Sequence, residues 1–117
     1  MSFFKDFLKG IMGTDTNISA QDAHKMMGES KDCVLLDVRT PFEYKEVRIK
    51  GAKLIPVDEL ASRAGAELPD KQANILIYCQ SGARSGRAVR ILSQMGYTNA
   101  RSFGGILNWP YETVRGE

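Results

Sequence analysis

Two short apolar runs constrain the fold of this chain more than any other feature. They are Cys33–Val38 and Asn74–Tyr78, and each has the length of a strand rather than of a buried helix. Mostly apolar runs of this kind are typical of strands covered on both faces, as in a parallel sheet. Two weaker runs, Lys53–Ile55 and Ala100–Phe103, have the same character. The sequence therefore predicts a sheet in which Asn74–Tyr78 lies centrally.

Helical patterns alternate with these strands. Helices are expected from Ser19 to about Gly28, from Val57 to Ala64, and from Arg84 or Ser85 to Met95. Strands that alternate with helices predict an α/β fold, with a central parallel sheet of about five short strands and helices on both faces.

Local signals predict where several of these elements begin and end. Ser19 followed by Asp22 has the form of a capping box at the start of the first helix. Pro41 allows only a turn or the first turn of a helix. Gly65 is expected to end the second helix, and Gly96 is placed for a left-handed C-cap on the third.

Composition indicates one ordinary globular domain. Of the 117 residues, 43% are hydrophobic and 26% are charged, and we assign residues 15–117 to the domain and residues 1–14 to a separate segment. The net charge of +2 is too small and dispersed for nucleic acid, although it suits small anions. No stretch approaches the roughly 20 apolar residues that span a bilayer, so integral membrane association is not expected.

The N-terminal segment has an apolar face at helical spacing. Phe3, Phe4 and Phe7 share that face with later apolar residues, while Lys5 and Asp6 interrupt it. We expect the face to pack on the domain or on a second subunit, where it would make a weak homodimer. The alternatives are a membrane-surface anchor and a frayed end.

The two cysteines, Cys33 and Cys79, are not spaced like metal ligands. No second cysteine or histidine lies near either at zinc-ligand spacing, so neither a metal nor a cofactor is expected. No secretory signal precedes them, which favours free thiols in a reducing cytoplasm. Cys33 opens an apolar run and is expected to be a packing residue or a spectator thiol, the alternative being a resolving partner for Cys79.

Cys79 directly follows the central apolar run and precedes a loop of small residues and a helix. Ligands of open α/β sheets bind at the carboxyl ends of the strands, where this cysteine lies. A helix N-terminus offers unpaired amides and a partial positive charge to an anion. The sequence therefore predicts Cys79 as a nucleophile and the following residues as its substrate-binding loop; these are Gln80, Ser81, Gly82, Ala83, Arg84 and Ser85. The alternative is an inert, apolar filler at a strand end.

The loop itself is expected to activate the thiol. A free cysteine titrates near about 8.5, and a helix N-terminus beside Arg84 should lower that pKa. His24 is the sole histidine, and nothing in the sequence places it near Cys79, so a Cys–His pair is not expected.

Three groups of residues resemble signatures of the rhodanese family, over nearly everything from Ile18 to Trp109. The first group is Leu36-Asp37-Val38-Arg39 with Glu43-Tyr44, Ile49-Lys50-Gly51-Ala52 and Ile55-Pro56; the second is Tyr78-Cys79 with Gly82, Arg84, Ser85 and Ala88; the third is Gly96-Tyr97 with Gly104-Gly105-Ile106 and Trp109. One departure is Val47-Arg48, where family members often have Gly-His.

The resemblance implies a rhodanese-like fold and sulfur transfer. Sulfurtransferases of this fold have a six-residue loop and related phosphatases a longer one, and here Arg84 follows Cys79 by five positions. The expected reaction moves sulfane sulfur from thiosulfate or a persulfide, through a Cys79 persulfide, to cyanide in vitro or to a cellular thiol or protein. Arg84 would bind the anionic donor. The alternatives are a non-enzymatic sulfur carrier or partner-binding module and, less favoured by loop length, a phosphatase or arsenate reductase.

Other polar and aromatic residues are assigned to the scaffold. Asp37 and Arg39 follow a neighbouring strand, and Arg39 is expected to form an ion pair with Glu43. Trp109 and Tyr111 are expected to be core or rim aromatics.

Overall fold

The computed structural model of the chain describes residues 16–116. The predicted amphipathic segment, residues 1–14, and its contact with a second subunit lie outside the described residues. Between residues 16 and 116, no helix has both the length and the apolar character needed to cross a membrane.

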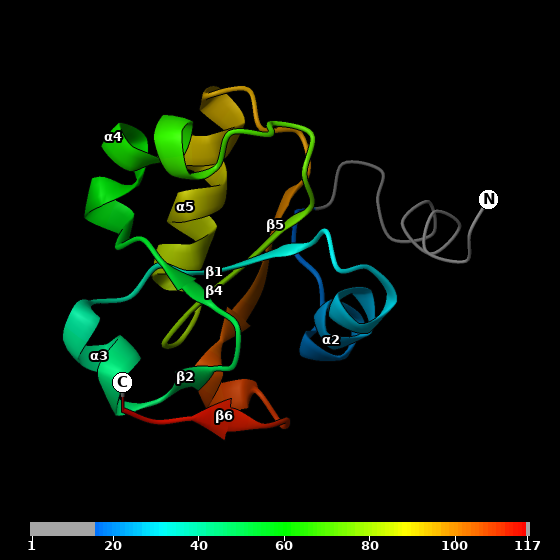
Figure 1. Ribbon diagram of the computed structural model, residues 1–117, viewed down its shortest axis with the longest axis vertical. Coiled ribbons are helices and arrows are strands. Elements are labelled where there is room, and N and C mark those ends of the chain that lie inside the picture. The colour runs from blue at the N-terminus through cyan, green and yellow to red at the C-terminus, as the bar shows by residue number, and fades with distance from the viewer. Residues whose placement is uncertain (1–15, 117) are drawn as a thin grey trace.

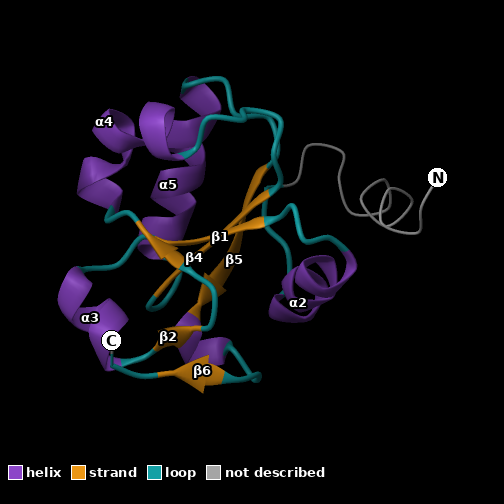
Figure 2. Cartoon of the chain, in the orientation of Figure 1, coloured by secondary structure: helices purple, strands orange, loops and turns teal. Residues whose placement is uncertain are grey.

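The sheet is parallel, as predicted, and four strands make it up. β1 (Val34–Asp37), β3 (Lys53–Leu54), β4 (Ile75–Cys79) and β5 (Ala100–Gly105) pair in the order β3-β1-β4-β5. These are the four apolar runs that the sequence singled out, against an expected total of about five strands, and Asn17 adds a single parallel bridge beside β5. Figure 2 shows these strands at the centre of the molecule. β4 is an inner strand of the sheet, which confirms its predicted central place.

Helices cover both faces of this sheet, which confirms the α/β prediction. α4 (Val57–Glu67) and α5 (Ala83–Gln94) pack together on one side, and α2 (Ala20–Glu29) lies on the other (Figure 1). α3 (Pro41–Glu46) lies beyond the end of β1.

A second, two-stranded sheet lies near the C-terminus. It pairs β2 (Arg48–Ile49) with β6 (Thr113–Val114) in the antiparallel sense, and a short 3-10 helix, η1 (Ile106–Asn108), follows β5. No sequence signal predicted this small sheet, because strands of two residues carry no periodicity.

β4 divides the core into two halves. Side chains alternate along a strand, so Ile75, Ile77 and Cys79 belong to the half under α4 and α5, while Leu76 and Tyr78 belong to the half under α2. All five are buried. The alternation thus places the Cys79 side chain on the α5 side of the sheet.

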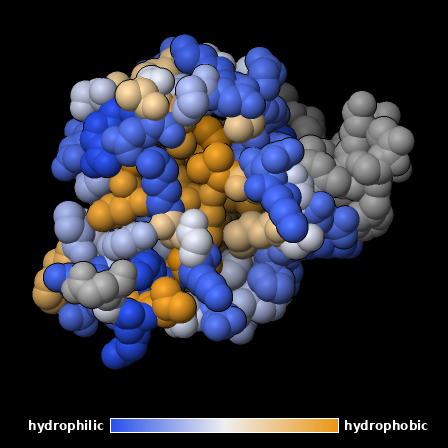
Figure 3. All heavy atoms as spheres, in the orientation of Figure 1, coloured by the Kyte–Doolittle hydropathy of each residue, from blue (hydrophilic) through white to orange (hydrophobic). Residues whose placement is uncertain are grey.

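On the surface, apolar side chains show in the middle of one face of the molecule, and polar side chains surround them (Figure 3).

The helix boundaries agree in part with the predictions. Ser19 caps α2 by accepting a hydrogen bond from the Asp22 N–H at 2.9 Å, which is one arm of the predicted capping box. Pro41 begins α3, and Gly96 has a φ of 97°, both as predicted. A complete capping box was not foreseen: it joins Thr40 and Glu43 at the start of α3.

α4 continues through Gly65 and ends at Glu67, so the prediction that it ends near Gly65 was wrong. Glycine inside a helix costs only about 1 kcal/mol, which tertiary contacts can offset. Here the Leu68 N–H closes the last turn on the Ala64 carbonyl, and Leu68 itself is buried. Packing of this last turn outweighs the weak preference of glycine for the helix end.

Candidate active site

Cys79 is the last residue of β4, and its sulfur lies within a turn of backbone N–H groups. The Gly82 N–H donates to Cys79 Sγ at 3.0 Å and the Ser85 N–H at 3.3 Å. Gly82 is the N-cap of α5 and has a φ of 122°, a conformation that favours glycine. This backbone rotation lets the chain curl around the sulfur and begin the helix at Ala83.

The surroundings of the sulfur favour the thiolate. Burial by itself would raise the pKa of the Cys79 thiol, but hydrogen bonds from the backbone and hydroxyl of Ser85 and from the backbones of Gly82 and Arg84 oppose it. Together these hydrogen bonds lower the pKa below the ordinary cysteine value. The direction agrees with the sequence-based expectation, and no histidine contributes.

The loop rests on Gly105 of β5, which the sequence reasoning had assigned only to a family signature. Gly105 pairs with Cys79 across the sheet, at a shift of register between β4 and β5. A Cβ atom on Gly105 would overlap the Gln80 carbonyl and Ser81 Cα. The loop can therefore approach β5 this closely only because residue 105 has no side chain.

The buried side chain of Ser85 connects the loop to β5 through hydrogen bonds. Its side chain is fully buried, and its Oγ lies 3.7 Å from Cys79 Sγ and 2.7 Å from Ser102 Oγ. Its hydroxyl also lies within hydrogen-bonding distance of the carbonyls of Gly82 and Gly104, at 3.0 and 3.2 Å. Ser102 is a residue that the sequence reasoning missed, because no local pattern marks it.

Arg84 forms an ion pair that the sequence did not predict. Its Nη1 and Nη2 atoms donate to Glu43 Oε1 and Oε2 at 2.8 and 3.0 Å. The hydrogen bond from Arg84, aided by Thr40 and opposed by partial burial, lowers the pKa of Glu43 to about 2. The predicted Arg39–Glu43 ion pair was wrong, since Glu43 pairs with Arg84 across 41 positions of sequence.

Arg39 instead pairs with Asp37, two positions away. Its Nε and Nη2 atoms donate to the Asp37 carboxylate at distances between 2.8 and 3.2 Å, and both side chains are almost completely buried. Arg39 Nη1 also donates to Gln80 Oε1 at 3.2 Å. The pair thus belongs to the scaffold, as predicted, and it supports the first residue of the loop.

The remaining loop residues lie at the surface. Ser81 and Ala83 are exposed, and Gln80 is half-buried against Arg39. The structure therefore brings Gly82, Arg84 and Ser85 to the sulfur through their backbones, while Ser81 and Ala83 form the outer wall of the loop.

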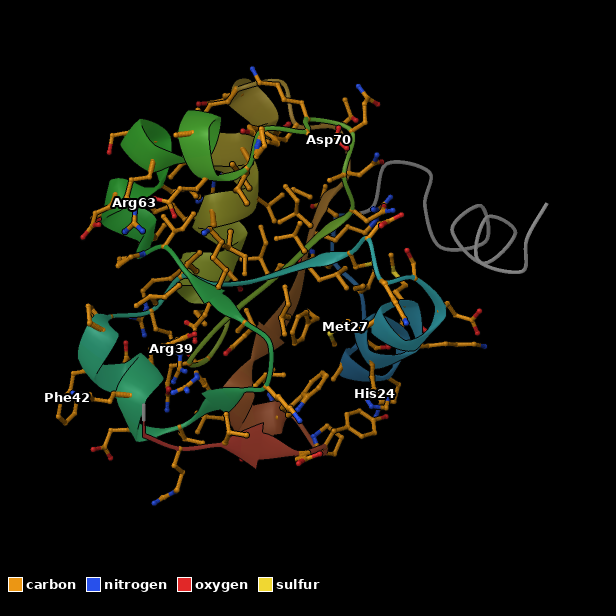
Figure 4. All side chains as sticks on the ribbon, viewed as in Figure 1. His24, Met27, Arg39, Phe42, Arg63 and Asp70 are labelled. Carbon is orange, nitrogen blue, oxygen red and sulfur yellow. The ribbon has the colours of Figure 1, made fainter. Side chains whose placement is uncertain are left out.

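Neither Cys33 nor His24 takes part in this site. Cys33 precedes β1, at the amino ends of the parallel strands, whereas Cys79 lies at the carboxyl end of β4. The Cys33 thiol donates to the Met26 carbonyl at 3.7 Å. His24 stacks on Tyr111 with ring centroids 3.8 Å apart, and Figure 4 shows it on the α2 side, away from Arg39.

The aromatic residues near the C-terminus agree with the scaffold role predicted for them. Trp109 is buried in the core half under α2, and Tyr111 packs against that half.

The site as a whole defines a class of protein. A parallel sheet holds a buried cysteine at the carboxyl end of an inner strand, and backbone N–H groups donate hydrogen bonds to its sulfur. Such a protein is suited to group transfer through a thiolate.

Comparison with known proteins agrees with this class. The sequence profile of the Rhodanese-like domain family matches residues 19–111. The thiosulfate sulfurtransferase PspE of Escherichia coli is 38% identical over 69% of this chain and 78% of its own length. A sulfurtransferase of Allochromatium vinosum is 34% identical over 79% of this chain and 85% of its own.

Solved structures show the same fold. A structure described as a rhodanese with anions from E. coli has a TM-score of 0.68 and 37% identity, covering 72% of this chain and 99% of the other. The chain belongs to the rhodanese-like domain family. Because both of these relatives are named sulfurtransferases, the prediction of a rhodanese sulfurtransferase is confirmed for family and enzyme class.

Proposed function

We propose that the chain moves sulfane sulfur from a small anionic donor to a thiophilic acceptor, through a persulfide on Cys79. The observation that carries this proposal is the pair of N–H groups, from Gly82 and Ser85, that donate to Cys79 Sγ. N–H groups that stabilise a thiolate also suit the terminal sulfur of a persulfide, which carries the same single negative charge.

The reaction has two balanced halves. In the first, the Cys79 thiolate attacks the outer sulfur of thiosulfate, the S–S bond of the donor breaks, and its electron pair leaves with sulfite. In the second, a nucleophile such as cyanide attacks the terminal sulfur of the persulfide, and the thiolate is released with thiocyanate. Covalent catalysis of this kind gives ping-pong kinetics.

The donor and acceptor are part of the proposal. The E. coli relative is named for thiosulfate, which makes that dianion the first donor to test. The acceptor in the cell would be a thiol or a protein. A thiolate that must stay unoxidised fits a reducing compartment, so the proposal includes a cytoplasmic location.

We also propose a weak homodimer through residues 1–14. Deletion of residues 1–13, followed by a measurement of the molecular mass in solution, would test it.

The function is tested by incubating the protein with thiosulfate and cyanide and measuring thiocyanate. The wild-type protein should turn over, and Cys79→Ala should lose turnover while Cys33→Ala keeps it. Thiosulfate alone should add one sulfur atom to the mass of the wild-type protein and none to Cys79→Ala. Thiocyanate production that survives in Cys79→Ala would overturn the mechanism.

The same preparations separate the rival functions. Release of phosphate from an aryl phosphate ester without thiocyanate production would support a phosphatase. A persulfide that forms and persists with every small acceptor would instead indicate a carrier with one protein acceptor.

A further inference from the structure

We propose that Glu43 is a specificity-determining residue that compensates the charge of Arg84 and so makes the site favour monoanionic sulfur donors over dianionic ones. This inference rests on the proposed function and adds the charge class of the donor. It concerns a residue of α3 that lies far from the cysteine in sequence and contacts the loop through Arg84.

The Glu43 carboxylate is held rigidly. Its Oε1 accepts hydrogen bonds from the Thr40 N–H at 2.9 Å and from the Thr40 hydroxyl at 3.1 Å, in the capping box of α3. The same carboxylate accepts the two parallel hydrogen bonds from Arg84. Bidentate pairs of this kind restrict the guanidinium to one orientation. Glu43 therefore fixes where the Arg84 charge lies as well as cancelling it.

The other guanidinium that contacts the loop is compensated too. Arg39 donates to Gln80 of the loop, and its charge is matched by the buried carboxylate of Asp37. Each arginine at the loop thus has its own carboxylate. The side chains of the two pairs carry no net charge when all four groups are ionised.

What attracts an anion to this loop is then mainly backbone. The Gly82 and Ser85 N–H groups and the N-terminus of α5 present a partial positive charge, equivalent to about half an elementary charge for a helix. A partial charge suits an incoming sulfur with one negative charge. A second negative charge on the donor gains little from the amides and meets no uncompensated cation, because Glu43 cancels the charge of Arg84. Monoanions such as organic persulfides and thiosulfonates are therefore favoured.

Two donors with matched chemistry can test the effect of charge. Thiosulfate is a dianion and methanethiosulfonate a monoanion, and each transfers its outer sulfur to a thiolate. The bond broken is S–S in both, and the electron pair leaves with sulfite in one case and with methanesulfinate in the other. The acceptor, cyanide, is held constant.

The central experiment compares kcat/KM for both donors in the wild-type protein and in Glu43→Gln. The amide keeps an oxygen that can accept from Thr40 but removes the negative charge. We expect kcat/KM to rise about fourfold for thiosulfate and about twofold for methanethiosulfonate, mainly through KM, because the variant leaves the Arg84 charge uncompensated and its attraction scales with donor charge. The gain should shrink at high salt.

Two further variants keep the test decisive. Glu46→Gln removes the same charge from an exposed position of α3, and it should leave the ratio of the two donors unchanged. Arg84→Gln leaves the Glu43 carboxylate uncompensated, so the ratio should move the other way, against thiosulfate. Thermal unfolding would verify that each variant is folded.

The outcomes separate this inference from the proposed function. Equal changes for both donors in Glu43→Gln, or the same ratio change in Glu46→Gln, would overturn the role of Glu43 while leaving sulfur transfer intact. Absence of thiocyanate from the wild-type protein with either donor would overturn the proposed function itself.

Discussion

The hydroxyl oxygens of Ser85 and Ser102 lie 2.7 Å apart, and both side chains are buried. The Gly104 N–H, which can only donate, points to Ser102 Oγ at 3.2 Å. Ser102 Oγ therefore accepts from Gly104, and in the contact between the two hydroxyls either oxygen can be the donor. Where Ser102 is the donor, the Ser85 hydrogen is left to bond either a neighbouring carbonyl or the thiolate of Cys79, 3.7 Å away.

Ser85→Ala should raise the pKa of Cys79, because the backbone and hydroxyl of Ser85 both help to lower it and the variant removes the hydroxyl. Loss of a hydrogen bond to a charged group predicts a fall in sulfur transfer at neutral pH of about tenfold. The pH dependence of iodoacetamide alkylation, measured in a Cys33→Ala background, would report the pKa. Ser102→Ala should shift it in the same direction by less, and a larger shift in Ser102→Ala would contradict this order.

Gly105→Ala should displace the loop, since the added Cβ would overlap the backbone of Gln80 and Ser81. We expect most of the activity to be lost, with a destabilisation of about 1–3 kcal/mol from overpacking. Gly86→Ala is the matched control, because its Cβ would meet nothing within 4 Å and alanine is favoured in a helix. Activity assays and urea unfolding on both variants distinguish them; retention of activity in Gly105→Ala would show that the loop tolerates the shift.

Asp37→Asn should destabilise the fold strongly, because it leaves the buried Arg39 guanidinium without a compensating charge. Breaking a buried pair from one side costs about 3–5 kcal/mol. Arg87→Gln removes an exposed ion pair with Asp58 and should cost less than about 1 kcal/mol. Urea denaturation of both variants provides the comparison, and equal losses would mean that burial of the Asp37–Arg39 pair contributes nothing.

The Glu43–Arg84 pair should make part of the stability depend on pH in the acid range. The pKa of Glu43 is about 2 in the folded chain, below the value of about 4.3 for an unfolded glutamate. A lowered folded-state pKa stabilises the fold above the unfolded pKa, and this contribution is lost as the pH falls through about 2. The difference in unfolding free energy between wild type and Glu43→Gln should be constant above about pH 5 and narrow toward pH 2. A difference that stays constant down to pH 2 would contradict the assignment.

Much of the fold was predictable because its signals are local. The apolar run ending at Tyr78, the proline that begins α3 and the glycine after α5 each act through bonds within a few residues. The failure at Gly65 has the same origin, since its weak local preference was outweighed by the packing of Leu68. Local signals thus predict elements well and their ends less well.

The cysteine and its loop were also predictable, because strand, loop and helix are consecutive in sequence. By contrast, the partners of that loop come from elsewhere: Glu43 from α3, and Ser102 and Gly105 from β5. Their positions follow from the strand order β3-β1-β4-β5, which brings β5 beside β4.

The wrong prediction for Arg39 shows where prediction from the sequence ends. Glu43 was a reasonable partner for Arg39 because it follows Arg39 by only four positions. In the folded chain Asp37 occupies both Nε and Nη2 of Arg39, while α3 turns Glu43 toward Arg84. The amino-acid sequence by itself determined that a cysteine ends a central strand and that the backbone of the loop and helix following it surrounds its sulfur. Only the tertiary structure decided which carboxylate meets which guanidinium, because opposite charges pair by distance in space and that distance depends on how the helices pack on the sheet.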